Sequence, residues 1–177
     1  MSVTVLVGNP RPGSRTASAA LAAADRVAAA LGLPGGHDLV ELAVLGPDLL
    51  VPGPPPEVAD ALHRVGTADV LIVASPTYKA TYTGLLKVFL DLLPSGALTG
   101  TTALPLLVMG SPAHTLAVEV HLRPLLVELG AEVPTPGLAV LQGSIAAGDG
   151  SELDAVLAPW VQRVAPQIRQ RLRGATA

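Results

Sequence analysis

Apolar residues in this chain fall into short runs, separated by loops rich in proline, glycine and hydroxyl side chains. Most of these runs are continuous rather than alternating and are rich in valine and leucine, as expected for strands that are buried on both faces. The pattern predicts five strands, the fifth irregular because it holds two prolines, at residues 3–8, 38–42, 70–75, 103–109 and 131–141.

Segments with helix-forming residues follow each strand. The pattern predicts five helices, at residues 17–31, 57–65, 85–93, 115–129 and 151–172, with a long loop at 43–56 and a flexible segment at 143–150. Strands that alternate with helices form a parallel sheet covered on both faces, with right-handed crossovers. We find no internal repeat and no linker, so we expect one α/β domain over residues 1–177.

Residues 74–94 (ASPTYKATYTGLLKVFLDLLP) contain the end of the third strand, a polar loop and the following helix. Ligands of open α/β sheets bind just beyond such strand ends. A flat heterocycle at this loop would meet backbone amides, the ring of Tyr78 and the ammonium of Lys79. Each side chain also has an ordinary interpretation, since Tyr78 could be a packing residue and Lys79 a solvated charge. The loop at 110–111, after the fourth strand, would let backbone approach the far edge of the same ligand.

The loop at residues 8–16 (GNPRPGSRT) follows the first strand and opens the first helix. A helix N-terminus carries unpaired N–H groups and a partial positive charge, which suit a phosphate. The guanidinium groups of Arg11 and Arg15 could add bidentate bonds to phosphate oxygens. The loop lacks both the GxxxxGK and the GxGxxG patterns, and a surface loop that only caps its helix fits the residues equally well.

Composition excludes several classes of function. A net charge of −3 argues against a general nucleic-acid surface, and the absence of cysteine removes disulfides and thiolate metal ligands. The four histidines show no metal-binding spacing, so no metal site is expected. No apolar run reaches the length of a membrane span and no leader pattern precedes the first strand, so we expect a cytoplasmic protein without a membrane segment.

Three separated motifs together resemble the NADPH-dependent FMN reductase family of the flavodoxin superfamily: GNPRPGSRT, SPTYKATYTGLLKVFLDLLP and GSPAHTLAVEVHLRPLL. The likeness is greatest to the FMN reductases of two-component alkanesulfonate monooxygenase systems and runs from residue 3 to about residue 142. It implies a flavodoxin-like three-layer sandwich with a five-stranded parallel sheet in the order 2-1-3-4-5. Asn9 stands where these proteins often have serine, and residues 43–56 match no motif of the family.

The resemblance also implies a set of cofactor-binding residues. The FMN phosphate would be bound by Arg11, Ser14, Arg15 and Thr16. The isoalloxazine would be lined by Pro76, Thr77, Tyr78 and Lys79, with Gly110 and Ser111 at its other side.

The function implied is hydride transfer from NADPH or NADH to FMN. The nicotinamide and flavin supply this chemistry themselves, so we assign no catalytic side chain. Only four aromatic residues are present, which favours an exchangeable FMN whose reduced form supplies a two-component monooxygenase. Two alternatives stay open: an NAD(P)H:quinone or azo-type reductase with tightly bound FMN, and a flavodoxin-type electron carrier.

Two predicted helices suggest self-association. The helix at 85–93 is apolar on nearly every side, so one side should face another subunit. Pro124 lies inside the helix at 115–129 and predicts a kink or π-bulge near Val120 and His121. The resemblance implies a homodimer or homotetramer. In related proteins an inserted residue in this helix, typically tyrosine, links flavin binding to assembly. Either His121 takes that part here, or Pro124 only bends the helix.

Overall fold

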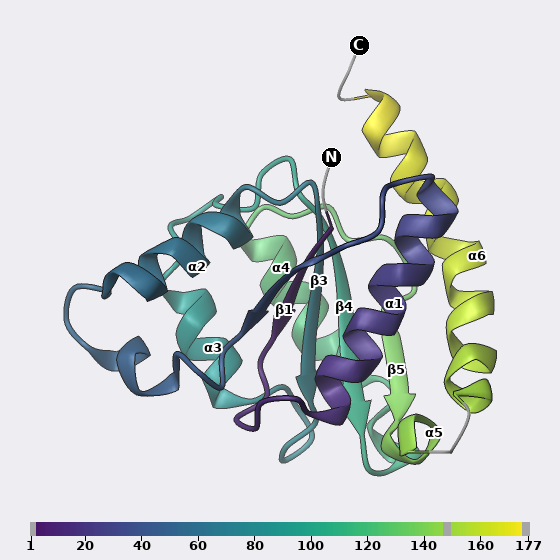
Figure 1. The fold of residues 1–177 in the computed structure, drawn as a ribbon, viewed down its shortest axis with the longest axis horizontal. Helices are drawn as coiled ribbons and strands as arrows, with labels where there is room; N and C mark the ends of the chain where they lie inside the picture. Colours follow the sequence, from purple (N-terminus) through teal and green to yellow (C-terminus); the bar gives the residue numbers. More distant parts are fainter. Residues whose placement is uncertain (1–2, 147–149, 175–177) are drawn as a thin grey trace.

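A computed structural model describes residues 3–146 and 150–174 and shows a five-stranded sheet in the order β2-β1-β3-β4-β5, with every neighbouring pair parallel (Figure 1). The strands are β1 (Val3–Val7), β2 (Asp38–Glu41), β3 (Val70–Pro76), β4 (Thr102–Met109) and β5 (Leu138–Leu141). The predicted α/β class and strand order are confirmed, and the fold is flavodoxin-like.

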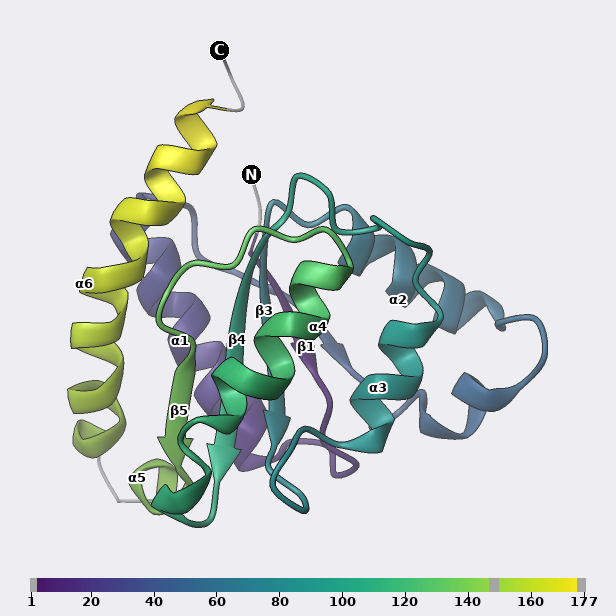
Figure 2. The ribbon, with the colours of Figure 1, turned by 180° about the vertical axis from the view of Figure 1, so that it is seen from behind.

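Helices cover both faces of the sheet and form a three-layer sandwich (Figures 1 and 2). One face packs against α1 (Arg15–Leu31) and α6 (Ser151–Gly174). The other packs against α2 (Pro56–Gly66), α3 (Gly84–Asp91) and α4 (Arg123–Glu128). Among the described residues, no helix has both the length and the apolarity needed to cross a bilayer.

The strand pattern explains these layers. Successive residues of a strand point to opposite faces, so Val5 and Val7 pack under α1 while Leu6 packs under α3, all three at most 1% exposed. Helix α1 presents alanines to the sheet, and these small side chains allow a close approach of helix and sheet. At the end of β1, a Cβ on Gly8 would lie 2.6 Å from the Cβ of Leu86, so only glycine lets β1 and α3 meet here.

The segment predicted as one helix at 115–129 is divided. A 3-10 turn (Pro112–His114) and a π-helix (Val118–Leu122) precede α4, so the predicted π-bulge near Val120 and His121 is confirmed. Pro124 has no N–H to donate back into the preceding turn, which removes one α-type hydrogen bond at the junction.

Three other predicted segments need correction. The fifth strand is only Leu138–Leu141 instead of 131–141, because Pro134 and Pro136 interrupt the ladder. Residues 143–150, predicted to be flexible, begin within a short helix, α5 (Gln142–Ala146), and residues 147–149 lie outside the described part. The loop at 43–56 contains a 3-10 helix, Gly46–Leu50.

Arg123 and Glu119 hold the loop before β5 in place; we call this pair the Glu119–Arg123 clasp. The two side chains pair, and the Arg123 guanidinium also donates to the carbonyl oxygens of Val133 (2.6 Å) and Pro134 (3.1 Å). Glu119 Oε1 accepts from the N–H of Gly137 at 2.5 Å. The hydrogen bond from Arg123, aided by that of Gly137, lowers the pKa of Glu119 below its ordinary value.

The indole of Trp160, on α6, also bonds to the loop before β5. Its Nε1–H donates to the carbonyl oxygen of Pro136 at 2.9 Å, and the residue is 5% exposed. A buried indole N–H normally needs such an acceptor. The irregular loop is therefore held from two helices by polar contacts rather than by a strand ladder.

Candidate functional site

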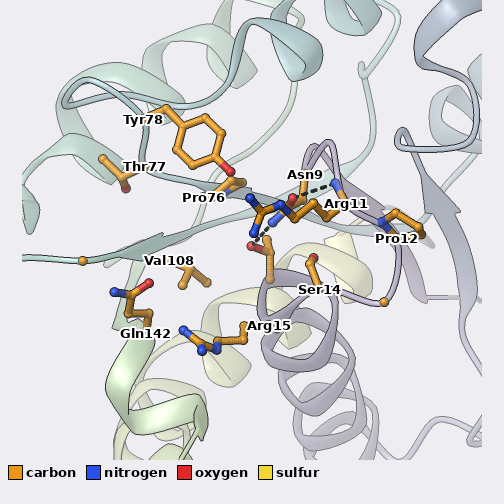
Figure 3. A pocket seen from close by; sticks show the side chains of 13 residues that line it. Asn9, Arg11, Pro12, Ser14, Arg15, Pro76, Thr77, Tyr78, Val108 and Gln142 are labelled. Atoms are coloured by element: carbon orange, nitrogen blue, oxygen red, sulfur yellow. Dashed lines mark hydrogen bonds between the residues drawn. The ribbon is translucent and has the colours of Figure 1, made fainter.

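A pocket of about 460 Å³ opens at the carboxyl ends of β1, β3 and β4, where an open α/β sheet binds ligands (Figure 3). The residues that line it come from four separate segments: Asn9, Arg11, Pro12, Gly13, Ser14, Arg15, Thr16, Pro76, Thr77, Tyr78, Val108, Gly110 and Gln142.

Asn9 shapes the loop between β1 and α1. Its buried side chain accepts from the N–H of Arg11 at 2.9 Å and donates to Thr16 Oγ1 at 3.0 Å, joining the two ends of the loop. Ser14 caps α1, with its Oγ accepting from the N–H of Ala17 at 3.2 Å. Asn9, which stands where the resembling proteins often have serine, thus stabilises the conformation of the loop.

Two guanidinium groups extend from this loop toward the pocket, those of Arg11 and Arg15 (Figure 3). Both residues are exposed, and within residues 3–146 and 150–174 neither guanidinium has an acceptor or an ion-pair partner. They stand at the N-terminal end of the 17-residue helix α1, where the helix dipole adds positive potential. Two uncompensated cations beside a helix N-terminus are suited to a phosphate.

The pocket's second wall begins where β3 ends. Thr77 donates its N–H to the carbonyl oxygen of Val108 at 2.7 Å, which continues the β3–β4 pairing beyond Pro76. The hydroxyl of Thr77 is buried and has no hydrogen-bond partner among the described residues. A buried polar group without a partner is costly, so a ligand that bonds to this hydroxyl would remove that cost.

A tight turn follows Thr77. Tyr78 and Thr81 exchange backbone hydrogen bonds of 2.8 and 3.3 Å across two residues, Lys79 and Ala80, whose φ angles are +52° and +69°. Positive φ at both central positions is typical of a type I′ turn, which usually contains glycine or asparagine. Each such residue costs on the order of 1 kcal/mol or more, and the surrounding structure has to hold it.

Two buried hydroxyl groups fix the base of this turn. Ser75 Oγ accepts from the N–H of Thr83 at 3.0 Å. Thr83 Oγ1 donates to the carbonyl oxygen of Gly8 at 2.5 Å and accepts from the N–H of Leu86 as the N-cap of α3. The ends of β1 and β3 and the start of α3 are therefore joined directly by hydrogen bonds.

The pocket includes eight of the ten residues expected at a flavin site. Lys79 does not line it, because it occupies the outer corner of the turn, and neither does Ser111, whose hydroxyl accepts from the N–H of Ala113 at 3.3 Å. The interpretation missed five lining residues: Asn9, Pro12, Gly13, Val108 and Gln142. Gln142 directly follows β5, so the same rule about strand ends would have found it.

The pocket joins two chemical environments. Arg11 and Arg15 supply positive charge, and Val108, Pro76 and the half-exposed ring of Tyr78 supply apolar surface. This combination fits a flat ring linked to a phosphate, as in FMN. Among the described residues, no group of three or more His, Asp or Glu side chains is placed to hold a metal ion.

Comparison with known proteins gives the same indication. The family model described as NADPH-dependent FMN reductase matches residues 1–144. A Pseudomonas putida protein named FMN reductase (NADPH) is 40% identical over 97 residues, which cover 55% of this chain and 49% of that protein. An Escherichia coli protein of the same name is 48% identical over 77 residues, covering 44% of this chain and 40% of that protein. The chain thus spans about half or less of the length of the curated relatives it matches.

Solved structures extend the likeness over nearly the whole chain. The apo form of an NADH:FMN oxidoreductase (EMOB) is 36% identical with a TM-score of 0.77, covering 92% of this chain and 89% of that one. An oxidoreductase from Corynebacterium diphtheriae is 28% identical with a TM-score of 0.81, covering 96% and 98%. Since the family model matches far more than half of the sequence, this chain belongs to the NADPH-dependent FMN reductase family.

Proposed function

We propose that this protein is an NAD(P)H-dependent FMN reductase whose substrates are FMN and NADPH or NADH. One observation carries the proposal: the guanidiniums of Arg11 and Arg15, which have no partner among the described residues, face the same pocket as the ring of Tyr78. Membership of the family and the names of the relatives support the same activity.

Under this proposal the residues of the chain bind and orient. Arg11, Arg15 and the hydroxyl of Ser14 hold the phosphate at the start of α1. Thr77 and Tyr78 line the ring, and the unpartnered Thr77 hydroxyl bonds to a polar atom of its edge. Bound nicotinamide and flavin would themselves supply the hydride-transfer chemistry, so none of the chain's side chains is assigned as catalytic.

We further propose that FMN is exchangeable and that its reduced form leaves to supply a flavin-dependent monooxygenase. Tyr78 is the one aromatic residue among those lining the pocket, and it is 47% exposed. A single open ring gives little stacking energy, whereas tight binding of a flat cofactor usually uses enclosing aromatic groups. The competing proposal, a quinone or azo-type reductase, requires FMN to stay bound.

Oxidation of NADPH and NADH by flavin-stripped protein, with and without added FMN, tests both proposals. We expect oxidation that saturates with added FMN, together with loss of FMN on dialysis. No oxidation under any condition would contradict the reductase and favour an electron carrier. Stoichiometric FMN retained through dialysis would contradict exchange and favour the reductase with a bound flavin.

We also propose that the chain assembles with copies of itself through the face that carries α3 and α4 (Figure 2). Leu116, Val120 and Val127 are 70%, 57% and 54% exposed along the segment that includes the π-helix and α4. Large apolar side chains gathered on one exposed segment are typical of an interface.

Light scattering of two variants tests this assembly. Val120→Asp introduces a charge on the proposed interface and should lower the mass of the particle, and His121→Ala should weaken a tetramer. Gln162→Glu adds a negative charge at an exposed position of α6, on the other face of the sheet, and serves as the control for altered surface charge. An unchanged mass for both Val120→Asp and His121→Ala would contradict the interface.

A further inference from the structure

Glu41 is an acidic residue that does not line the cationic pocket itself but bonds to Gly13, which does. It is the last residue of β2 and pairs in register with Val7, the last residue of β1. The two parallel strands end at the same edge of the sheet, so Glu41 lies beside the loop that leads from β1 to α1. Its Oε1 accepts from the N–H of Gly13 at 3.0 Å.

This hydrogen bond supports the loop conformation. Gly13 has a φ of +59°, in the left-handed region that favours glycine, and its N–H points to the Glu41 carboxylate. The amide of Gly13 is therefore already used and is not free for an anion in the pocket. Among the described residues, no other carboxylate bonds to residues 8–16.

The charge of Glu41 acts against the same loop's attraction for anions. Arg11 and Arg15 form no ion pair with it, so its negative charge is not neutralised by the cations that line the pocket. This carboxylate bonds to Gly13, the residue before the helix cap Ser14, so it would lie near a phosphate held at the start of α1. Unlike charges attract and like charges repel over such distances, with limited screening when the groups are partly buried.

We propose that Glu41 is a specificity-determining residue that weakens binding of the flavin's phosphate monoester and keeps FMN exchangeable. This inference rests on the proposed function. The carboxylate holds the loop conformation through Gly13 and at the same time repels the phosphate. The binding loop is therefore preformed, but its affinity for FMN is lowered. The uncharged end of a flavin is unaffected by this repulsion.

Glu41→Gln separates the two roles, because the amide oxygen can still accept from Gly13 while the charge is gone. Titration of the stripped protein with FMN and with riboflavin, followed by flavin fluorescence, measures both affinities. At low ionic strength we expect FMN to bind on the order of tenfold more tightly to the variant, as estimated for unit charges several ångströms apart near a protein surface. Riboflavin, which has no phosphate, should bind equally to both, and the FMN difference should shrink as salt is added.

Two further variants complete the design. Glu128→Gln makes the same charge change at the end of α4, away from the pocket, and should leave FMN affinity unchanged. The neighbouring residue, Leu129, accepts from the N–H of Leu98, which places this position at the opposite end of the sheet. Glu41→Ala also removes the acceptor for Gly13 and should bind FMN less tightly than Glu41→Gln.

The outcomes are distinct. FMN affinity equal in the wild type and Glu41→Gln, or tightened equally by Glu128→Gln, overturns the inference. An equal gain for riboflavin overturns it as well, because the effect would then not act on the phosphate. Failure of the wild type to bind either flavin overturns the proposed function instead.

Discussion

The structure uses arginine in two contrasting ways, at the Glu119–Arg123 clasp and at the loop between β1 and α1. The Arg123 side chain is 16% exposed and bonds to a carboxylate and two carbonyl oxygens. Arg11 and Arg15 are exposed and have no acceptor in the described part of the chain. The first arginine is satisfied by the fold itself, and the other two are left for a ligand.

This difference assigns separate roles to the two regions. A guanidinium that satisfies buried acceptors contributes to stability, since its loss leaves those acceptors unpaired. A guanidinium without partners contributes almost nothing to folding but can bind an anion at no cost in broken contacts. Stability should therefore depend on the clasp and affinity on the loop.

The largest effect is expected for Arg123→Ala. It leaves the Glu119 carboxylate without its counter-ion and the Val133 and Pro134 carbonyl oxygens without a donor, a cost of about 2–4 kcal/mol in the free energy of unfolding. Denaturant unfolding measures it. Arg11→Ala is the matched control and should change stability by less than about 0.5 kcal/mol. Equal losses in the two variants would contradict the comparison.

Arg15→Ala and Arg11→Ala should lower the affinity for FMN without lowering the stability of the fold. Loss of a charge-assisted bond to phosphate should weaken FMN binding by about 10- to 100-fold, while riboflavin binding and thermal stability stay the same. Flavin fluorescence titration supplies both affinities. If riboflavin affinity falls as much as FMN affinity, these arginines do not bind the phosphate.

Gly137→Ala tests the clasp by crowding it. A Cβ at this position would lie 2.8 Å from Val118 Cγ2 and 3.1 Å from Glu119 Oε1, and so should lower stability by about 1–3 kcal/mol. Gly143→Ala is the control, because its Cβ would meet nothing within 4 Å. Thermal unfolding of the two variants should differ clearly, and similar curves would show that the loop before β5 adapts.

The smallest effect concerns pH. The pKa of Glu119 is lowered in the folded state, so its contribution to stability is complete above its ordinary value of 4.5 and is lost as pH falls through the folded pKa. Glu119→Gln should therefore be less stable than the wild type at neutral pH and approach it in acid. Denaturant midpoints at several pH values measure this. A gap that is constant with pH would exclude a role for the carboxylate's charge.

Much of the fold was predictable because buried parallel strands are continuous apolar runs. Val3–Val7 and Val70–Pro76 are easily recognised, and turns rich in proline and glycine mark their ends. The fifth strand was predicted too long because Pro134 and Pro136 interrupt hydrogen bonding in a way that apolar content does not reveal. Side chains from elsewhere in the chain, such as Arg123 and Trp160, hold that loop instead of a ladder.

The position of the candidate site was also predictable, but the direction of individual side chains was not. Arg11 and Arg15 follow from the rule about strand ends and helix starts. Lys79 lies outside the pocket because of a turn with two positive φ angles, which its sequence, without glycine or asparagine, does not signal. Gln142 directly follows both the predicted and the observed end of the fifth strand, so the rule about strand ends could have indicated it as well.

The single tryptophan has a practical consequence for optical measurements. Trp160 is bonded to the loop that the clasp holds, whereas both tyrosines, Tyr78 and Tyr82, belong to the segment between β3 and α3. Selective excitation of Trp160 therefore gives a fluorescence spectrum that reports the environment of the loop before β5. The loop held by the clasp and the segment after β3 carry different natural chromophores, so local opening of the clasp can be recorded in the unlabelled protein.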